Sequence, residues 1–284
     1  MLYNQRICVI LHLYYQDLWE DIKPYLLNLD KVTSFDLYIT ITQENKNLTD
    51  DINSSFSENV NIHIEQIENL PQGADIYPFI HIINKIDLDK YDILYKIHSK
   101  RNIEDLYIKS NGIYLGKNLW RDYMLNEILG KQNIKKCIQV FQNKPKIGAV
   151  GFMPLLIEVN EENPMIFHKP SEIYSLFSSK IKISLQNKYK FIGGTNFAIR
   201  ANILKCIKNT YDKTTFSENA GVKFSNVTYA FEDLMGYIVE NQGYRFSGTC
   251  IFSNKIILNF LSRKSLRILF KLYVNIFIFR RNII

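Results

Sequence analysis

Short apolar runs rich in β-branched residues alternate with segments of helical period through the first third of the chain, and this alternation is the strongest constraint on the fold. Buried strands are predicted at residues 6–13, 35–42, 60–67 and 93–97. Helices are predicted between them, at residues 16–29, 49–56 and 76–86. Strands that alternate with helices predict a doubly wound, mostly parallel α/β sheet with right-handed crossovers.

The rest of the chain has less regular patterns. Further elements are predicted as helices at residues 119–129, 134–141 and 231–241 and as a fifth strand at residues 147–152. A short helix is expected to run through Ile207, and Gly243 is expected to end the last helix. Residues 153–187 show no clear period and are interpreted as a variable excursion, while residues 208–227 are polar and are predicted to form a loop.

Composition places the chain among globular proteins. Of its 284 residues 46% are hydrophobic and 13% aromatic, with 12 Gly and 7 Pro, which excludes a disordered or fibrous chain. The four cysteines are widely spaced and form no Cys-x-x-Cys or Cys/His pattern, so neither a zinc site nor a disulfide framework is indicated. A reducing compartment is therefore expected. The apolar run at residues 6–13 is too short, and begins too polar, for the core of a secretory signal.

Positive charge is concentrated at the C-terminus of the chain. The formal net charge is +7, and residues 251–284 hold seven of the 35 Lys and Arg but no Asp or Glu. Residues 1–250 therefore carry 28 charges of each sign. A neutral body argues against nucleic-acid binding, which needs a basic face. We divide the chain into a domain at residues 1–250 and a basic tail at residues 251–284.

The tail is predicted to contain a basic amphipathic helix over residues 262–284. Lys271 and Asn275 interrupt its longest apolar part, which is too short for the roughly 20 residues that a bilayer requires. Such a helix is typical of peripheral contact with an anionic cytoplasmic leaflet. The alternative is a C-terminal helix that packs on the body or in an oligomer interface.

The predicted strand at residues 93–97 ends abruptly in polar and charged residues. His98, Ser99, Lys100 and Arg101 follow it directly. Ligands of open α/β sheets bind outside the carboxyl ends of the strands, so these side chains are expected to face that crevice. Cations at this place suit a phosphate-bearing ligand. The alternative is that Lys100 and Arg101 begin a solvated loop.

Several short motifs occur in a fixed order between residues 6 and 250. They are Gly73, Asp75, Pro78 and Phe79 in one segment, then Lys96, His98 and Lys100, then Trp120 and Arg121 ahead of Leu129 and Gly130, then Pro145 and Gly148. This order resembles the rhamnan synthesis protein F family of polysaccharide rhamnosyltransferases, which are glycosyltransferases of the GT-A type. The resemblance implies a GT-A-like fold. It implies a nucleotide-sugar site that contains His12, Tyr14, Gly73, Asp75, Lys96, His98, Lys100 and Arg101.

Two later segments resemble the wider group of inverting GT-A enzymes. Gly193-Gly194-Thr195 is similar to their glycine-rich segment, so the resemblance implies that it lines the donor and acceptor together with Trp120 and Arg121. Glu232-Asp233 is similar to their acidic pair at a helix start, whose second acid is the general base. The rhamnan family usually has Glu-Arg at this point, so either Asp233 or Glu232 could be the base. A helix start also favours an ionised acid.

The metal-binding Asp-x-Asp of most GT-A enzymes would fall on His98-Ser99-Lys100 in this sequence. An ammonium group cannot ligate magnesium or manganese. Asp87-Leu88-Asp89 spells the motif but precedes the strand, so it is predicted to be a solvated turn at the opposite end of the sheet. We therefore expect no metal cofactor. Lys100, with His98, Arg101 or both, is expected to neutralise the leaving diphosphate.

Several of these residues also have simpler structural explanations. Asp75 could cap the helix at residues 76–86, and Gly73 could only allow a turn. His12 could be satisfied structurally at the end of its strand. Gly193-Gly194 could form a bulge, and Glu232-Asp233 could be ordinary acids of a first helical turn.

The sequence favours an inverting glycosyltransferase that extends a bacterial surface polysaccharide or lipopolysaccharide at the cytoplasmic face of the membrane. The expected partners are a nucleotide-diphosphate sugar and a glycan or lipid-linked glycan acceptor, and the family resemblance implies L-rhamnose from a dTDP donor. One alternative is a non-catalytic nucleotide-sugar or glycan-binding component of a membrane assembly. A nucleotidyltransferase would need a glycine-rich phosphate loop and metal carboxylates, which the sequence lacks.

Overall fold

The computed structural model describes residues 5–101, 106–108, 113–115, 120–162, 168–217 and 227–249, with the backbone alone at residues 106–108, 113–115 and 120. The predicted basic amphipathic helix at residues 262–284 lies outside the described residues, as does the rest of the predicted tail domain. Within the described part of the chain, no helix combines the length and the apolar character that crossing a bilayer requires.

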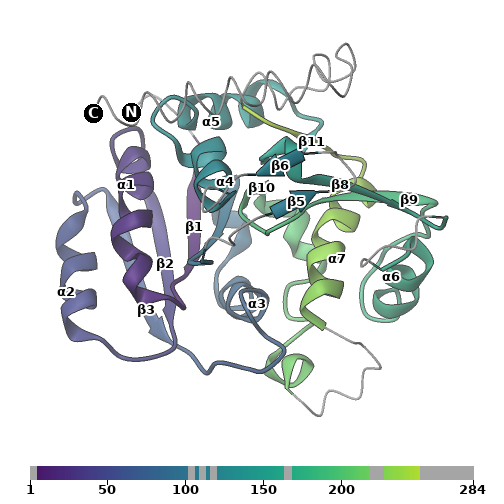
Figure 1. Cartoon of the computed structure of the whole chain (residues 1–284), viewed down its shortest axis with the longest axis horizontal. Helices are drawn as coiled ribbons and strands as arrows, with labels where there is room; N and C mark the ends of the chain where they lie inside the picture. Colours follow the sequence, from purple (N-terminus) through teal and green to yellow (C-terminus); the bar gives the residue numbers. More distant parts are fainter. Residues whose placement is uncertain are drawn as a thin grey trace.

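A seven-stranded sheet forms the centre of the molecule, in the order β11-β7-β10-β4-β1-β2-β3 (Figure 1). Its strands are β1 (Ile7–His12), β2 (Phe35–Ile41), β3 (Val60–Gln66), β4 (Ile93–His98), β7 (Ile147–Gly151), β10 (Phe197–Arg200) and β11 (Arg245–Ser247). All neighbouring pairs are parallel except those of β10, which runs antiparallel to β4 and β7. The predicted mostly parallel α/β fold is confirmed, and its arrangement is consistent with a GT-A-like fold.

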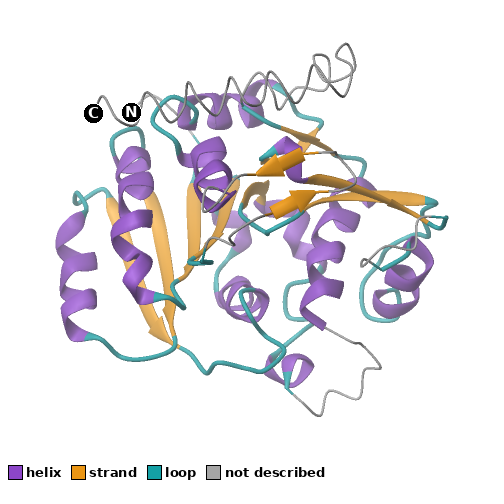
Figure 2. Ribbon diagram, viewed as in Figure 1, coloured by secondary structure: helices purple, strands orange, loops and turns teal. Residues whose placement is uncertain are grey.

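Helices cover both faces of this sheet (Figure 2). One face packs against α1 (Trp19–Asp30), α2 (Lys46–Ser55), α4 (Trp120–Leu129) and α5 (Ile134–Asn143). The other face packs against α3 (Ile76–Lys85) and α7 (Val227–Asn241), and α6 (Pro170–Phe177) packs on α7 within the same apolar core. Alternate residues of β1 enter the two cores, Ile7 and Val9 on one side and Cys8 and Ile10 on the other, because successive strand residues point to opposite faces. The doubly wound prediction is therefore confirmed.

Two small antiparallel sheets accompany the main one. They are β5 (Leu106–Ile108) with β6 (Ile113–Leu115), and β8 (Leu156–Asn160) with β9 (Lys188–Ile192). Helix α7 packs very closely on β9 at Gly236, where an added Cβ would lie 2.1 Å from the carbonyl oxygen of Lys190. This glycine lets α7 approach the β8–β9 sheet closely, because any side chain at this position would collide with the backbone of β9.

Short 3₁₀ helices connect several of these elements. They are η1 (Gln16–Leu18), η2 (Leu88–Lys90), η3 (Met153–Leu155), η4 (Ala201–Cys206) and η5 (Lys213–Phe216). The predicted solvated turn at residues 87–89 is confirmed, since η2 precedes β4 and the Asp89 side chain is 75% exposed beside Lys205.

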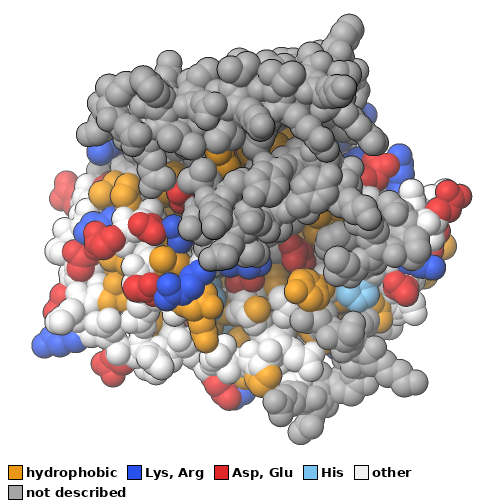
Figure 3. Space-filling model, viewed as in Figure 1, with side chains coloured by type: hydrophobic (Ala, Val, Ile, Leu, Met, Phe, Trp, Pro, Cys, Tyr) orange, Lys and Arg blue, Asp and Glu red, His pale blue; other side chains and the backbone are white. Residues whose placement is uncertain are grey.

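On the face drawn in Figure 3, basic and acidic side chains are mixed.

The structure adds detail to one prediction about the second half of the chain and corrects another. Residues 153–187 lack a clear sequence period, yet they contain η3, β8 and α6. The helix predicted at residues 231–241 begins at Val227, where Val227 and Ala230 are buried. Glu232 and Asp233 therefore lie in the second turn of α7. The helix dipole acts mainly on the first turn, so it does not explain this acidic pair.

Candidate functional site

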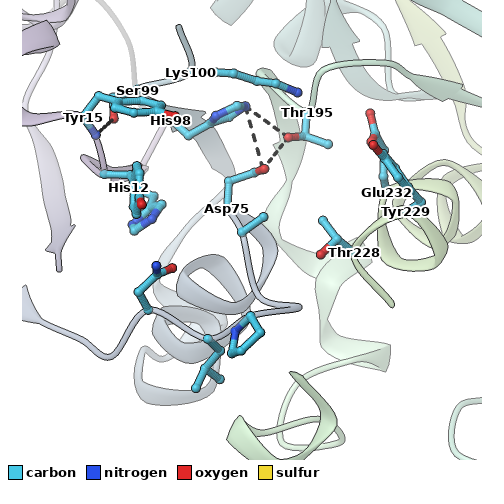
Figure 4. A pocket seen from close by; sticks show the side chains of 15 residues that line it. His12, Tyr15, Asp75, His98, Ser99, Lys100, Thr195, Thr228, Tyr229 and Glu232 are labelled. Carbon is cyan, nitrogen blue, oxygen red and sulfur yellow. Dashed lines mark hydrogen bonds and ion pairs between the residues drawn. The ribbon is translucent and has the colours of Figure 1, made fainter. Parts of the chain in front are cut away.

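A cavity of about 420 Å³ opens at the carboxyl ends of β1 and β4 (Figure 4). The parallel pairing of these strands sets His12 beside His98, and both side chains line the cavity. The other walls come from the turn before α3, from Thr195 ahead of β10, and from α7. This is the crevice at which ligands of open α/β sheets bind.

A buried ionic cluster of Asp75, Lys96 and Thr195 supports the cavity. The Lys96 side chain is 1% exposed, and its ammonium pairs with the Asp75 carboxylate and donates to Thr195 Oγ1 at 2.9 Å. Burial opposes ionisation of Asp75, but the positive charge of Lys96 and the hydrogen bonds from Lys96 and Thr195 favour the carboxylate, so the pKa of Asp75 lies below its ordinary value. Asp75 occupies the N-cap position of α3, as expected, but its side chain makes no capping hydrogen bond to this helix.

Gly194 and Thr195 form a tight turn in which both residues have positive φ, +83° and +52°. A left-handed conformation at Thr195 costs about 1–2 kcal/mol, and hydrogen bonds to Asp75 and Lys96 hold it. Both backbone polar groups of Gly194 have partners. Its carbonyl oxygen lies 2.8 Å from His98 Nε2, and its N–H donates to Glu232 Oε1 at 2.7 Å. The strained turn thus connects the end of β4 to the carboxylate of α7.

Glu232 presents its carboxyl group to the cavity from α7. Burial raises the pKa of Glu232 to about 7, and the negative charge of Asp75 adds to this effect. The apolar residues Ile192 and Met235 line a second, small cavity together with Glu232. A carboxyl group with a pKa near neutrality can both hold and accept a proton under physiological conditions.

Asp233 does not line this cavity. Its side chain is 1% exposed, and its Oδ2 accepts hydrogen bonds from the backbone N–H of His168 at 3.0 Å and from His168 Nδ1 at 2.9 Å. Burial raises the pKa of Asp233. The structure therefore separates the two acids that the sequence pairs, with Glu232 at the cavity and Asp233 in a buried contact with His168.

Of the groups expected to neutralise a diphosphate, Lys100 lines the cavity, and Figure 4 shows its side chain extending toward Thr195 and Glu232. Burial lowers the pKa of His98 to about 4, so this ring is neutral near pH 7. Arg101 lies outside the cavity lining, where it pairs with Asp17 at 2.9 Å and its guanidinium lies 4.5 Å from the Tyr15 ring centre.

The wall at the end of β1 contains His12, Tyr14 and Tyr15. Burial lowers the pKa of His12 to about 4, and its Nδ1 lies 2.9 Å from the hydroxyl of Thr40. Tyr14 is 40% exposed. The backbone N–H of Tyr15 donates to Ser99 Oγ at 2.8 Å. This bond fastens the segment after β1 to the segment after β4, so the two polar strand ends form one surface.

Other predicted site residues do not line the cavity. Gly73 serves the turn before α3, because an added Cβ would approach the Tyr77 Cβ to 2.9 Å. Arg121 pairs with Asp21 at 2.8 Å and reaches the Lys100 carbonyl oxygen at 3.5 Å, so it supports the cavity from behind. Gly193 donates its N–H to the carbonyl of Leu155. Lys96 acts through Asp75 and does not line the cavity, and the side chain of Trp120 lies outside the described residues.

The side chains at the carboxyl end of β4 do not fit a divalent cation. Of the two carboxylates that line the cavity, Asp75 is engaged by Lys96 and Thr195 and Glu232 by the N–H of Gly194, and Lys100 adds a positive charge. Hard cations bind several oxygen ligands at once. Among the residues that the structure describes, no three His, Cys, Asp or Glu side chains are grouped so that they could hold a metal ion.

Ser99, which follows β4 and was expected to face the crevice, lines the cavity. Thr228, Tyr229 and His168 contribute to the site or its support and were not predicted to do so. His168 had no signal in the sequence, because its contact with Asp233 joins residues 65 positions apart. Thr228 and Tyr229 fall in the first turn of α7, which the sequence pattern placed too late.

Comparison with known proteins identifies the family of this chain. Two proteins named "Uncharacterized protein WxcX", from two strains of Xanthomonas campestris pv. campestris, are each 23% identical to this chain over 239 residues. The match covers 84% of this chain and 32% of each relative, so the chain spans about a third of their length. The family described as rhamnan synthesis protein F (RgpF) matches residues 1–244, which links the chain to rhamnan or polysaccharide synthesis. The chain thus belongs to the rhamnan synthesis protein F family.

Proposed function

We propose that this chain is an inverting glycosyltransferase that moves a sugar from a nucleotide-diphosphate donor to a growing surface polysaccharide or lipopolysaccharide. The observation that carries the proposal is one cavity lined by both the Glu232 carboxyl group, with a pKa of about 7, and Lys100. A base matched to the operating pH and a cation for a departing diphosphate are the two groups that this reaction needs.

In the proposed reaction an acceptor hydroxyl attacks the anomeric carbon of the donor sugar while the bond from that carbon to the diphosphate oxygen breaks. The Glu232 carboxylate takes the hydroxyl proton, and the electron pair of the broken bond leaves with the nucleoside diphosphate. Attack opposite to the leaving group inverts the anomeric configuration. Glu232, rather than Asp233, is the proposed base, because Asp233 is buried against His168.

The leaving diphosphate is stabilised by Lys100 without a metal ion in this proposal. His98 is neutral near pH 7 and instead orients the Gly194 carbonyl. Donors arranged before the reaction stabilise developing charge at little reorganisation cost. Transfer is therefore expected to persist in EDTA, and a loss in EDTA that manganese restores would contradict this part of the proposal.

The family description, rhamnan synthesis, supports L-rhamnose as the transferred sugar, and we propose a glycan or lipid-linked glycan as the acceptor. We also propose that the enzyme works at the cytoplasmic face of the membrane, with peripheral contact through residues 262–284. Deletion of these residues is expected to release the chain from membranes into the soluble fraction. Unchanged partitioning would remove the membrane proposal and leave the transfer reaction intact.

The experiment is a panel of nucleotide sugars that includes dTDP-L-rhamnose, UDP-glucose and GDP-mannose. Each is tested by thermal shift for binding and by release of nucleoside diphosphate for hydrolysis or transfer, with Glu232→Gln as the inactive control. We expect one donor to stabilise both proteins and to be turned over by the wild type alone. Binding without turnover in the wild type would favour a non-catalytic nucleotide-sugar-binding component. The observation that supports this alternative is that Asp233 is hydrogen-bonded to His168 and does not face the cavity.

A further inference from the structure

Two tyrosines keep apolar surface open inside the cavity. Among the described residues, the large hydrophobic side chains that stay exposed are Tyr14, Leu185 and Tyr229, with exposed fractions of 40%, 58% and 46%. Tyr14 and Tyr229 line the cavity, and Leu185 does not. Aromatic surface that stays open in a polar cleft is typical of a ligand-binding site.

Tyr229 lies on α7, three residues before Glu232, and residues at this spacing share one side of a helix. Figure 4 shows their side chains next to each other on the same wall. The hydroxyl of Thr228 donates to the Gln72 carbonyl oxygen at 2.6 Å. This bond ties the first turn of α7 to the turn before α3, so the Tyr229 ring is held beside the proposed base.

The two exposed tyrosines belong to different walls of the cavity. Tyr14 follows β1 and packs edge-on against Tyr15, with ring centres 4.8 Å apart. Tyr229 belongs to α7, and in Figure 4 Asp75 and Thr195 lie between α7 and the segment after β1. If the nucleobase of the donor lies on the Tyr14 side and its sugar approaches Glu232, the Tyr229 ring remains available to the acceptor.

The chemistry of a pyranose suits this ring. One face of the sugar carries C–H bonds and packs on an aromatic surface, while its hydroxyl groups project from the edge and remain free to hydrogen-bond. We propose that Tyr229 is the acceptor platform: the terminal pyranose of the glycan acceptor stacks its C–H face on this ring and so presents one hydroxyl to Glu232. The inference rests on the proposed function, since it assigns Glu232 as the base.

Saturation-transfer NMR on the full chain with bound dTDP tests the platform without requiring turnover. The probes are methyl α-L-rhamnopyranoside and methyl α-D-glucopyranoside, and rhamnitol is the open-chain control that lacks a rigid C–H face. We expect the ring C–H protons of at least one glycoside to receive the strongest saturation, and rhamnitol to receive little. Tyr229→Ala should weaken the glycoside by about tenfold, or about 1.4 kcal/mol. Tyr229→Phe keeps the ring and should weaken it by less than about threefold.

Leu185→Ala is the matched control, because it also removes an exposed apolar side chain but lies outside the cavity. The platform is overturned if neither glycoside binds the wild type, if rhamnitol binds as well as they do, or if Tyr229→Ala changes glycoside affinity no more than Leu185→Ala. An equal loss in Tyr229→Phe would assign the effect to the hydroxyl and would also overturn stacking. Absence of turnover with normal glycoside binding defeats the proposed function instead.

Discussion

The two sides of α7 give its adjacent carboxylates different surroundings. Glu232 faces the cavity and accepts one hydrogen bond, from the N–H of Gly194 at 2.7 Å. Asp233 is buried and accepts two hydrogen bonds from His168. Successive helix residues point about 100° apart, so a single ligand cannot meet both acids in the same way. The Glu-Asp pair in the sequence indicates which helix borders the site, but the packing of that helix determines which of the two carboxylates reaches the cavity.

The largest expected effect is on the cavity side. Glu232→Gln should lower kcat for transfer by about 10²–10⁴-fold, because the amide can still accept the Gly194 hydrogen bond but cannot take a proton. Asp233→Asn is the matched variant on the buried side and should lower kcat much less. Steady-state release of nucleoside diphosphate measures both. A reversal of the two effects, with each variant shown to be folded by circular dichroism, would make Asp233 the base.

The cation at the cavity should matter next. Lys100→Met is expected to lower kcat by about 10²-fold, since it removes a charge beside the departing diphosphate. Arg101→Met is the control, because this neighbouring cation is engaged with Asp17 and Tyr15 outside the cavity lining. Calorimetric titration with the nucleoside diphosphate should show weaker binding for Lys100→Met. Equal losses in the two variants would mean that general charge, rather than position, accounts for the effect.

Most of the fold was predictable because its strands and helices bury apolar residues at regular spacing. Strands β1 to β4 and helix α3 begin and end within a few residues of their predicted bounds. Strand β8 and helix α6 were missed, since both are short and lie in an otherwise irregular stretch. The sequence did contain a signal for the start of α6, a proline at its first position and a glutamate two residues later. In the structure Pro170 opens the helix, and the side chain of Glu172 accepts a hydrogen bond from the N–H of Lys169.

The site was predictable in its location and less so in its orientations. Of the run after β4, His98, Ser99 and Lys100 line the crevice as predicted, because the carboxyl ends of parallel strands meet there, whereas Arg101 turns away to Asp17. Which of Glu232 and Asp233 faces that crevice depends on the rotation of α7, which is set where Gly236 packs on the backbone of β9. That contact joins residues far apart in the chain. A glycine inside a helix costs about 1 kcal/mol relative to Ala, and this cost was a signal of close packing.

The buried side of α7 should affect stability more than catalysis. Asp233→Ala is expected to lower the free energy of unfolding by about 1–3 kcal/mol, because it leaves the hydrogen-bond donors of His168 without their acceptor. Urea denaturation measures the change. Asp89→Ala, in an exposed ion pair with Lys205, is the control and should leave the unfolding midpoint unchanged. Equal midpoints for Asp233→Ala and the wild type would show that the buried contact contributes little.

The smallest expected effect on catalysis is the pH dependence that Glu232 gives to the rate. Because burial raises the pKa of Glu232 to about 7, the base is mostly protonated in mild acid. The value of kcat/KM for the wild type should therefore rise by about tenfold between about pH 6 and about pH 8 and then level off. Steady-state rates in buffers of constant ionic strength measure this profile. A profile already flat below about pH 6 would require a base with an ordinary carboxyl pKa.

Stability should respond to the same group with the opposite sign. The folded protein holds the Glu232 proton more tightly than the unfolded chain, whose ordinary value is 4.5, so unfolding releases a proton within this window. The free energy of unfolding therefore falls as pH rises from about 4.5 to about 7. Glu232→Gln cannot titrate and should lack this part of the decline, so its stability relative to the wild type should increase with pH. Parallel stability curves would show that the pKa of Glu232 is the same in the folded and unfolded states and would remove the raised pKa as support for Glu232 as the base.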